Sequence, residues 1–181
     1  MKEIELTKTS IFVDHLNKSS LLKNREIKRN ILTQIKSQPK ILNNLDEHDD
    51  IKVFLNQHMC WVMDHQTDFF YKHSKKNLSP IGDVFAIFKD QHQSTKLKNY
   101  ENPYNLYDSP DYTYIYVVQS GSPENYIVFE YDNHIRKKLS WQVPLETGKF
   151  IMWNSSLNYY LTPNKTIKST IAMLVHCQIK K

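Results

Sequence analysis

The strongest constraint on the fold is a series of short apolar runs that begins near Pro80 and continues through the rest of the sequence. The runs are strand-sized, and residues that favour turns separate them, for example at 120–123, 132–133 and 163–164. Many short strands at this spacing are typical of a sandwich or jelly roll. The polar stretch 90–110 interrupts the series and is predicted to be a long loop at a sheet end. We predict strands over 83–89, 112–119, 125–131, 139–143, 149–153, 157–162 and 168–178.

The first third of the chain has a different pattern. Two short strands are predicted over 4–7 and 11–13. Isoleucines then recur every four residues between 27 and 35, which predicts an amphipathic helix over about residues 20–37. A second helix is predicted over about residues 50–73, with acidic residues at its start, where the helix dipole favours them. We therefore expect a single, mainly β domain over 1–181, in which strands and two helices of 1–79 pack on a jelly-roll core of 80–181.

Composition excludes several classes of protein. Three scattered glycines (Gly82, Gly121 and Gly148) cannot form a glycine-rich phosphate loop. No segment reaches the roughly 18 apolar residues that would span a bilayer, and no apolar stretch follows the charged N-terminus as in a secretory signal. Cys60 and Cys177 form no CxxC or CxxH pair, so a zinc ribbon is excluded and both are expected to be buried thiols.

The net charge of +5 raises the question of nucleic-acid binding. Of the 24 basic residues only three are arginines, namely Arg25, Arg29 and Arg136. Arginine is the side chain that grips phosphate and base edges with paired hydrogen bonds. A lysine surplus spread along the chain is more typical of a soluble surface, so nucleic-acid binding is kept as an alternative and is not favoured.

One stretch resembles a known family. Residues 148–164 and 168–172 read Gly-Lys-Phe-Ile-Met-Trp-Asn-Ser-Ser-Leu-Asn-Tyr-Tyr-Leu-Thr-Pro-Asn and Lys-Ser-Thr-Ile-Ala. This is similar to the C-terminal half of the 2-oxoglutarate/iron(II)-dependent oxygenases, in the small branch common in tailed phages and marine bacteria. The strands at 4–13 and 114–118 resemble that family's first strands and the strand after its first metal motif. The resemblance implies a double-stranded β-helix, and a setting in a virion or in the cytoplasm of a host cell.

The residues that the family's chemistry needs are replaced. Such enzymes hold iron(II) with two histidines and one carboxylate. By the resemblance, the distal histidine falls at Tyr159, and the arginine that pairs with 2-oxoglutarate falls at Lys168. The His-x-His or His-x-Asp motif falls near Asn105 to Tyr107, where the sequence Asn-Leu-Tyr contains neither motif. The resemblance therefore implies a vestigial pocket of Asn105, Tyr107, Tyr159, Lys168 and Trp153, with no catalytic residue, metal ligand or cofactor.

Other residues could rebuild a metal site, and these alternatives stay open. One is a shifted triad of His92 and His134 with Asp108 or Asp111, and another is a group of His58, His65, Asp64 and Asp68 on the predicted second helix. The acidic residues at 46–50 are interpreted as a helix cap. His176 and Cys177 are neighbours on one predicted strand, so their side chains should point to opposite faces.

The sheet-forming half is rich in tyrosine, with eight of the eleven tyrosines between residues 100 and 131. Tyrosine is a common strand residue, so ordinary sheet packing explains most of them. The functional interpretation is an aromatic surface for another protein or a glycan, or a stacking platform for single-stranded nucleic acid.

We therefore predict a non-catalytic, oxygenase-like jelly roll that acts in binding or assembly with a protein partner, as a phage virion-associated or accessory protein. The first alternative is a 2-oxoglutarate/iron(II)-dependent hydroxylase with atypical metal ligands, in which Lys168 would bind the co-substrate. The second alternative is a basic nucleic-acid-binding protein.

Overall fold

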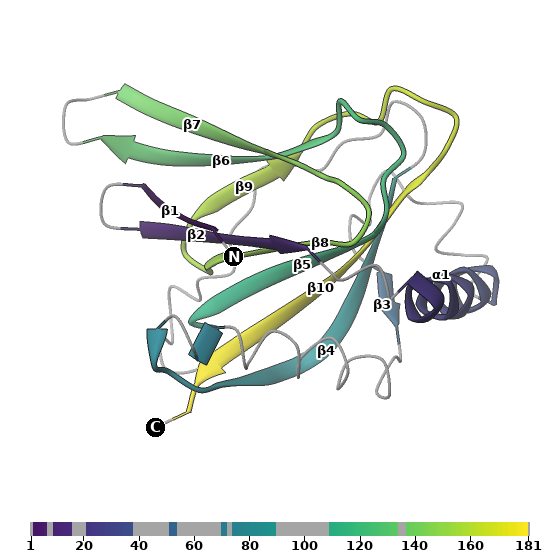
Figure 1. Cartoon of the computed structure of the whole chain (residues 1–181), viewed down its shortest axis with the longest axis horizontal. Coiled ribbons are helices and arrows are strands. Elements are labelled where there is room, and N and C mark those ends of the chain that lie inside the picture. The colour runs from purple at the N-terminus through teal and green to yellow at the C-terminus, as the bar shows by residue number, and fades with distance from the viewer. Residues whose placement is uncertain are drawn as a thin grey trace.

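The computed structural model describes residues 2–6, 9–15, 21–37, 51–53, 70–71, 74–89, 109–133 and 137–180. Two antiparallel sheets dominate it, one with strand order β1-β2-β8-β5-β10-β4-β3 and one with order β7-β6-β9 (Figure 1). The elements are β1 (Lys2–Leu6), β2 (Thr9–His15), α1 (Leu21–Lys36), β3 (Ile51–Val53), β4 (Leu78–Lys89), β5 (Tyr112–Gln119), β6 (Tyr126–Asn133), β7 (Lys137–Pro144), β8 (Lys149–Asn154), β9 (Asn158–Leu161) and β10 (Thr170–Ile179). The predicted mainly β jelly-roll fold is confirmed.

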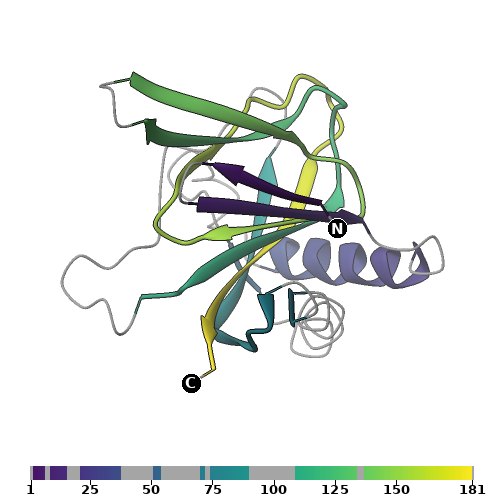
Figure 2. The ribbon, with the colours of Figure 1, turned by 60° about the vertical axis from the view of Figure 1, so that its left-hand side comes forward.

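The predicted first helix is also confirmed, as α1. It lies along one face of the large sheet (Figure 2), and the isoleucines Ile27 and Ile31 are fully buried there. They belong to a helix-side cluster that also contains Tyr116 and Phe150 from the sheet. Burial of one apolar stripe of a helix provides most of its stability in a protein of this kind.

The predicted second helix over 50–73 is wrong at its start. Residues Ile51–Val53 form strand β3, which pairs with β4 so that Ile51 lies opposite Ala86. Two of these three residues are β-branched, and the edge of β4 offers backbone hydrogen bonds that a helix would not use. Phe70 and Tyr71 are helical, and residues 54–69 lie outside the described part of the chain.

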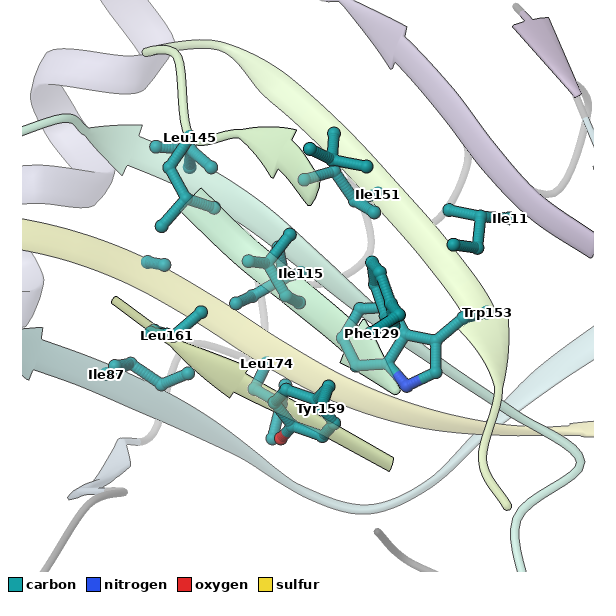
Figure 3. Close-up of a cluster of buried hydrophobic side chains, with 14 of the residues drawn as sticks. Ile11, Ile87, Ile115, Phe129, Leu145, Ile151, Trp153, Tyr159, Leu161 and Leu174 are labelled. Carbon is teal, nitrogen blue, oxygen red and sulfur yellow. The ribbon is translucent and has the colours of Figure 1, made fainter. Parts of the chain in front are cut away.

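The other face of the large sheet packs against the small sheet. Side chains from both sheets fill the space between them and form what we call the inter-sheet cluster (Figure 3). Its members are Ile11, Ile87, Ile115, Val117, Ile127, Phe129, Val143, Leu145, Ile151, Trp153, Leu157, Tyr159, Leu161, Ala172 and Leu174. These side chains determine how much space the interior between the two sheets offers.

The N-terminal strands extend the large sheet rather than forming a separate layer. Strand β2 pairs with β8, with Ile11 opposite Trp153, and β1 pairs with β2. Among the described residues, no helix is long and apolar enough to cross a membrane.

Candidate functional site

Tyr159 stands where the family resemblance puts the distal histidine. It lies on β9, directly opposite Phe129 of β6, and none of its surface is exposed. Its ring makes an edge contact with the indole of Trp153 across the inter-sheet space, with ring centroids 4.8 Å apart. Figure 3 shows Phe129, Trp153 and Tyr159 gathered together. The position of the expected iron ligand is therefore occupied by a packed aromatic core.

Trp153 is the centre of this aromatic group. It lies on β8 of the large sheet, and its ring is 5.2 Å from that of Phe129. The residue is completely buried, and its indole nitrogen Nε1 has no hydrogen-bond partner in the described part of the structure. An unpaired N–H in the interior costs free energy and is rare in folded proteins. Trp153 thus combines full burial against two aromatic rings with an orphaned indole N–H among the described residues.

Lys168, expected by resemblance to face the co-substrate, lies outside this group. It is exposed and precedes β10, whose first residue is Thr170. Its backbone carbonyl accepts a 2.8 Å hydrogen bond from Asn164 Nδ2. The structure thus brings Trp153 and Tyr159 together and leaves Lys168 apart from them. Asn105 and Tyr107, the other two predicted pocket residues, lie outside the described residues.

A dense polar network fixes the segment that carries Lys168. Asn125 Nδ2 donates to Thr170 Oγ1 at 2.6 Å, and the Gly121 amide donates to the same oxygen at 3.0 Å. A Cβ atom on Gly121 would overlap the carbonyl oxygen of Lys168. This close approach of two backbones requires a glycine at 121, and it holds the 164–170 segment against the 121–125 turn.

A second polar group was not predicted from the sequence. Thr113 Oγ1 lies 2.7 Å from Ser155 Oγ and 3.0 Å from His176 Nδ1, and all three residues are buried. Thr113 is directly opposite Trp153 on β8 and opposite His176 on β10. The side chains of Thr113, Trp153 and His176 therefore share one face of the large sheet. The only signal for this group is strand register, which becomes known once the pairing of the strands is known.

The other candidate ligands do not form a site among the described residues. Asp111 is exposed, and its Oδ2 accepts a 2.7 Å hydrogen bond from the backbone amide of Ile179. No three His, Cys, Asp or Glu side chains come together in the described part of the chain. The remaining candidates lie outside it, namely His58, Asp64, His65, Asp68, His92, Asp108, His134 and the acidic residues at 46–50.

The described cysteine is unsuited to nucleophilic chemistry. Cys177 is a free thiol buried in the helix-side cluster, while its neighbour His176 contacts Thr113 on the opposite face. Burial raises the pKa of the Cys177 thiol to about 12, so it stays protonated at neutral pH. Cys60 lies outside the described residues.

The described residues do not fit an iron(II) and 2-oxoglutarate centre. A phenol keeps its proton until about pH 10 and is a poor replacement for imidazole at iron(II). Tyr159 also fills the interior with its ring, and Trp153 lies against it. The exposed ammonium of Lys168 is not directed into the inter-sheet cluster.

The fold itself is a double-stranded β-helix. No family profile matches the sequence, and no curated protein matches it. Among solved structures, AviO1 from Streptomyces viridochromogenes Tue57 is similar over 94% of this chain and 89% of its own, with TM-score 0.62 and 8% identity. A Pseudomonas putida prolyl-4-hydroxylase is similar over 94% and 93%, with TM-score 0.59 and 6% identity. The non-heme alpha-ketoglutarate-dependent epimerase SnoN of nogalamycin biosynthesis is similar over 93% and 77%, with TM-score 0.60 and 9% identity. At these identities the likeness defines the fold and does not extend to the reaction.

Proposed function

We propose that this protein is a non-catalytic jelly roll of the oxygenase fold that binds a protein partner. The observation that carries the proposal is Tyr159, which stands fully buried at the expected histidine position and packs against Trp153. A packed aromatic interior stabilises the fold, and it puts a phenol ring where the family resemblance expects a metal ligand. The resemblance to the phage branch supports a role as a virion-associated or accessory protein, and we include that setting in the proposal.

An aromatic row leads from this interior to the surface and supports a binding role. On the small sheet Tyr159 lies opposite Phe129, and Phe129 lies opposite Trp141, so the three share one face. Tyr159 is buried, whereas Trp141 on β7 keeps 43% of its surface exposed. The hairpin of β6 and β7 extends beyond the body of the molecule in both views (Figures 1 and 2).

The chemistry of β7 favours a protein as the partner. Among the described residues, β7 pairs only with β6, so its outer edge can accept another strand. Leu139, two residues from Trp141, is also exposed on the same face. Backbone hydrogen bonds along an edge strand, with a tryptophan beside them, are a common basis for protein–protein recognition.

Metal and co-substrate binding test the absence of catalysis. The purified full chain is melted anaerobically with iron(II) or manganese(II), with and without 2-oxoglutarate, and iron content and succinate formation are measured. A ligand that binds only the folded form must raise the melting temperature. We expect no shift, no stoichiometric iron and no succinate. Stoichiometric iron together with succinate formation would overturn the proposal.

The binding surface is tested separately with matched variants. Trp141→Ala removes the exposed end of the aromatic row, and Gln142→Ala changes its exposed neighbour on the other face of β7. We expect a co-purifying partner protein to be lost with Trp141→Ala and kept with Gln142→Ala. Equal retention by both variants would remove the hairpin from the proposal.

The fold likeness favours a second candidate function, an oxygenase with atypical ligands. The similar structures over 93% or more of this chain include a prolyl-4-hydroxylase and an alpha-ketoglutarate-dependent epimerase. This candidate requires ligands from other parts of the chain, for which His92 and His134 are the sequence-based choices. Succinate formation that disappears with His92→Ala or His134→Ala would establish it in place of the first proposal.

A further inference from the structure

The outer side of α1 carries a row of basic side chains. A hollow of about 400 Å³ on this side is lined by Arg25, Lys28, Arg29, Leu32, Thr33 and Lys36. These positions are spaced by three or four residues along the helix, so they form a single face. Two of the three arginines in the chain lie one turn apart on it. We call these six residues the α1 basic face.

The opposite side of α1 anchors this face on the large sheet. Ile27 and Ile31 are fully buried against the sheet. Asn24 donates from Nδ2 to the Val118 carbonyl at 2.9 Å, and its Oδ1 accepts a 2.7 Å hydrogen bond from the Tyr116 hydroxyl. Polar and apolar contacts together therefore fix the helix, and the cations are presented from a rigid support.

The charges of the α1 basic face are not neutralised within the described structure. Four of the six residues are basic and none is acidic. An ion pair on this helix joins Lys23 to Glu26 at 3.1 Å, and neither of these two residues lines the hollow. Within the described ranges, no carboxylate forms an ion pair with Arg25, Arg29 or Lys36.

We propose that the α1 basic face binds the phosphodiester backbone of a nucleic acid. From Arg25 to Lys36 the row is about 16 Å long at ~1.5 Å per residue, which spans several phosphates rather than one. Arginine pairs with phosphate through its planar fork, and one turn separates Arg25 from Arg29. No aromatic side chain lines the hollow, so bases have nothing to stack on and binding is independent of sequence.

The same features disfavour a membrane surface. A helix that binds a bilayer inserts its apolar face between the lipids. The apolar face of α1 is occupied, because Ile27 and Ile31 are buried in the helix-side cluster. This inference does not depend on the proposed function, since α1 lies on the other face of the large sheet from Tyr159.

Fluorescence anisotropy of labelled DNA tests the proposal on the full chain. A duplex and a single strand of the same sequence distinguish the two forms of the backbone. We expect affinity for at least one of them at about 50 mM salt, falling linearly on a log–log plot as salt rises. The double variant Arg25→Gln with Arg29→Gln should weaken binding at least about tenfold and reduce the salt slope by about two.

The control removes the same charge elsewhere. Lys76→Gln with Lys180→Gln changes two exposed lysines that do not line the hollow, and should weaken binding far less. Retention of the native melting temperature shows that each double variant is folded. Lack of binding to both DNA forms at about 50 mM salt would overturn the proposal. So would equal loss in the two double variants, or binding to anionic phosphatidylserine vesicles without binding to DNA.

Discussion

The two faces of the large sheet both carry buried aromatic residues, but they differ in whether the polar atoms of those residues are hydrogen-bonded. On the face that α1 covers, Tyr116 stacks on Phe150 with ring centroids 4.6 Å apart, and its hydroxyl donates to Asn24. On the face toward the small sheet, Trp153 packs against Phe129 and Tyr159, and its Nε1 has no partner among the described residues. One aromatic group is completed by hydrogen bonds and the other is not.

This difference lies in hydrogen bonding, since both aromatic groups are buried. In the helix-facing group, the Tyr116 hydroxyl and the Asn24 amide are hydrogen-bonded, as most buried polar groups in proteins are. The inter-sheet group lies beside the buried polar set of Thr113, Ser155 and His176. Departures from full hydrogen bonding concentrate at functional sites in natural proteins. An orphaned N–H beside a packed tyrosine is consistent with the vestigial pocket that we propose.

The largest expected effect is that of emptying the inter-sheet group. Tyr159→Ala should lower the free energy of unfolding by about 3–5 kcal/mol, because a large buried ring leaves a cavity. Urea denaturation followed by fluorescence measures the change. The control, Tyr160→Ala, removes a half-exposed ring on the other face of β9 and should cost much less. Equal losses for the two variants would contradict a tightly packed interior at Tyr159.

A smaller effect is expected on the helix side. Asn24→Ala leaves the Val118 carbonyl and the Tyr116 hydroxyl without their buried partner, which should cost about 2 kcal/mol. Thr33→Ala, at an exposed position of the same helix, should change stability by less than about 0.5 kcal/mol. Thermal denaturation compares the two variants. A neutral Asn24→Ala would show that the hydrogen bonds do not anchor α1.

The smallest effect is expected for Trp153→Phe. This change loses part of a buried ring, which destabilises, and removes an unpaired N–H, which stabilises. The two contributions should leave a net loss of less than about 1 kcal/mol in urea denaturation. A loss as large as that of Tyr159→Ala would indicate that the indole N–H is hydrogen-bonded in solution, and the contrast between the two sheet faces would disappear.

The sequence predicted the parts of this protein that depend on local pattern. The isoleucine spacing of α1 was sufficient because it marks one buried face of a helix, and β5 and β8 were recognised as short continuous apolar runs because both of their faces are buried. The start of the predicted second helix failed at Ile51–Val53, where pairing with β4 decides the conformation. A three-residue strand carries too short a pattern to compete with a helix cap signal.

Some contacts at the candidate site agree with the family resemblance, and others do not follow from it. The resemblance placed Tyr159 and Trp153 in one expected pocket, and their rings are in contact. It did not predict that Lys168 is exposed, because the position of its backbone depends on a hydrogen bond from the nearby Asn164 and on the close approach of Gly121 from a distant turn. The resemblance did not predict the group of Thr113, Ser155 and His176. These residues come from β5, from the residue after β8 and from β10, which are far apart in the sequence and meet only when the strands pair.

The pairing of β2 with β8 sets the order in which the chain can fold. Ile11 finds its partner Trp153 only after roughly 140 further residues have been made, so early in synthesis β2 can pair with β1 but not with β8. Contacts between such distant segments give the fold a high contact order, and refolding in milliseconds to seconds rather than microseconds is expected. The ribosome therefore releases the first strands of this protein long before the strand that stabilises them.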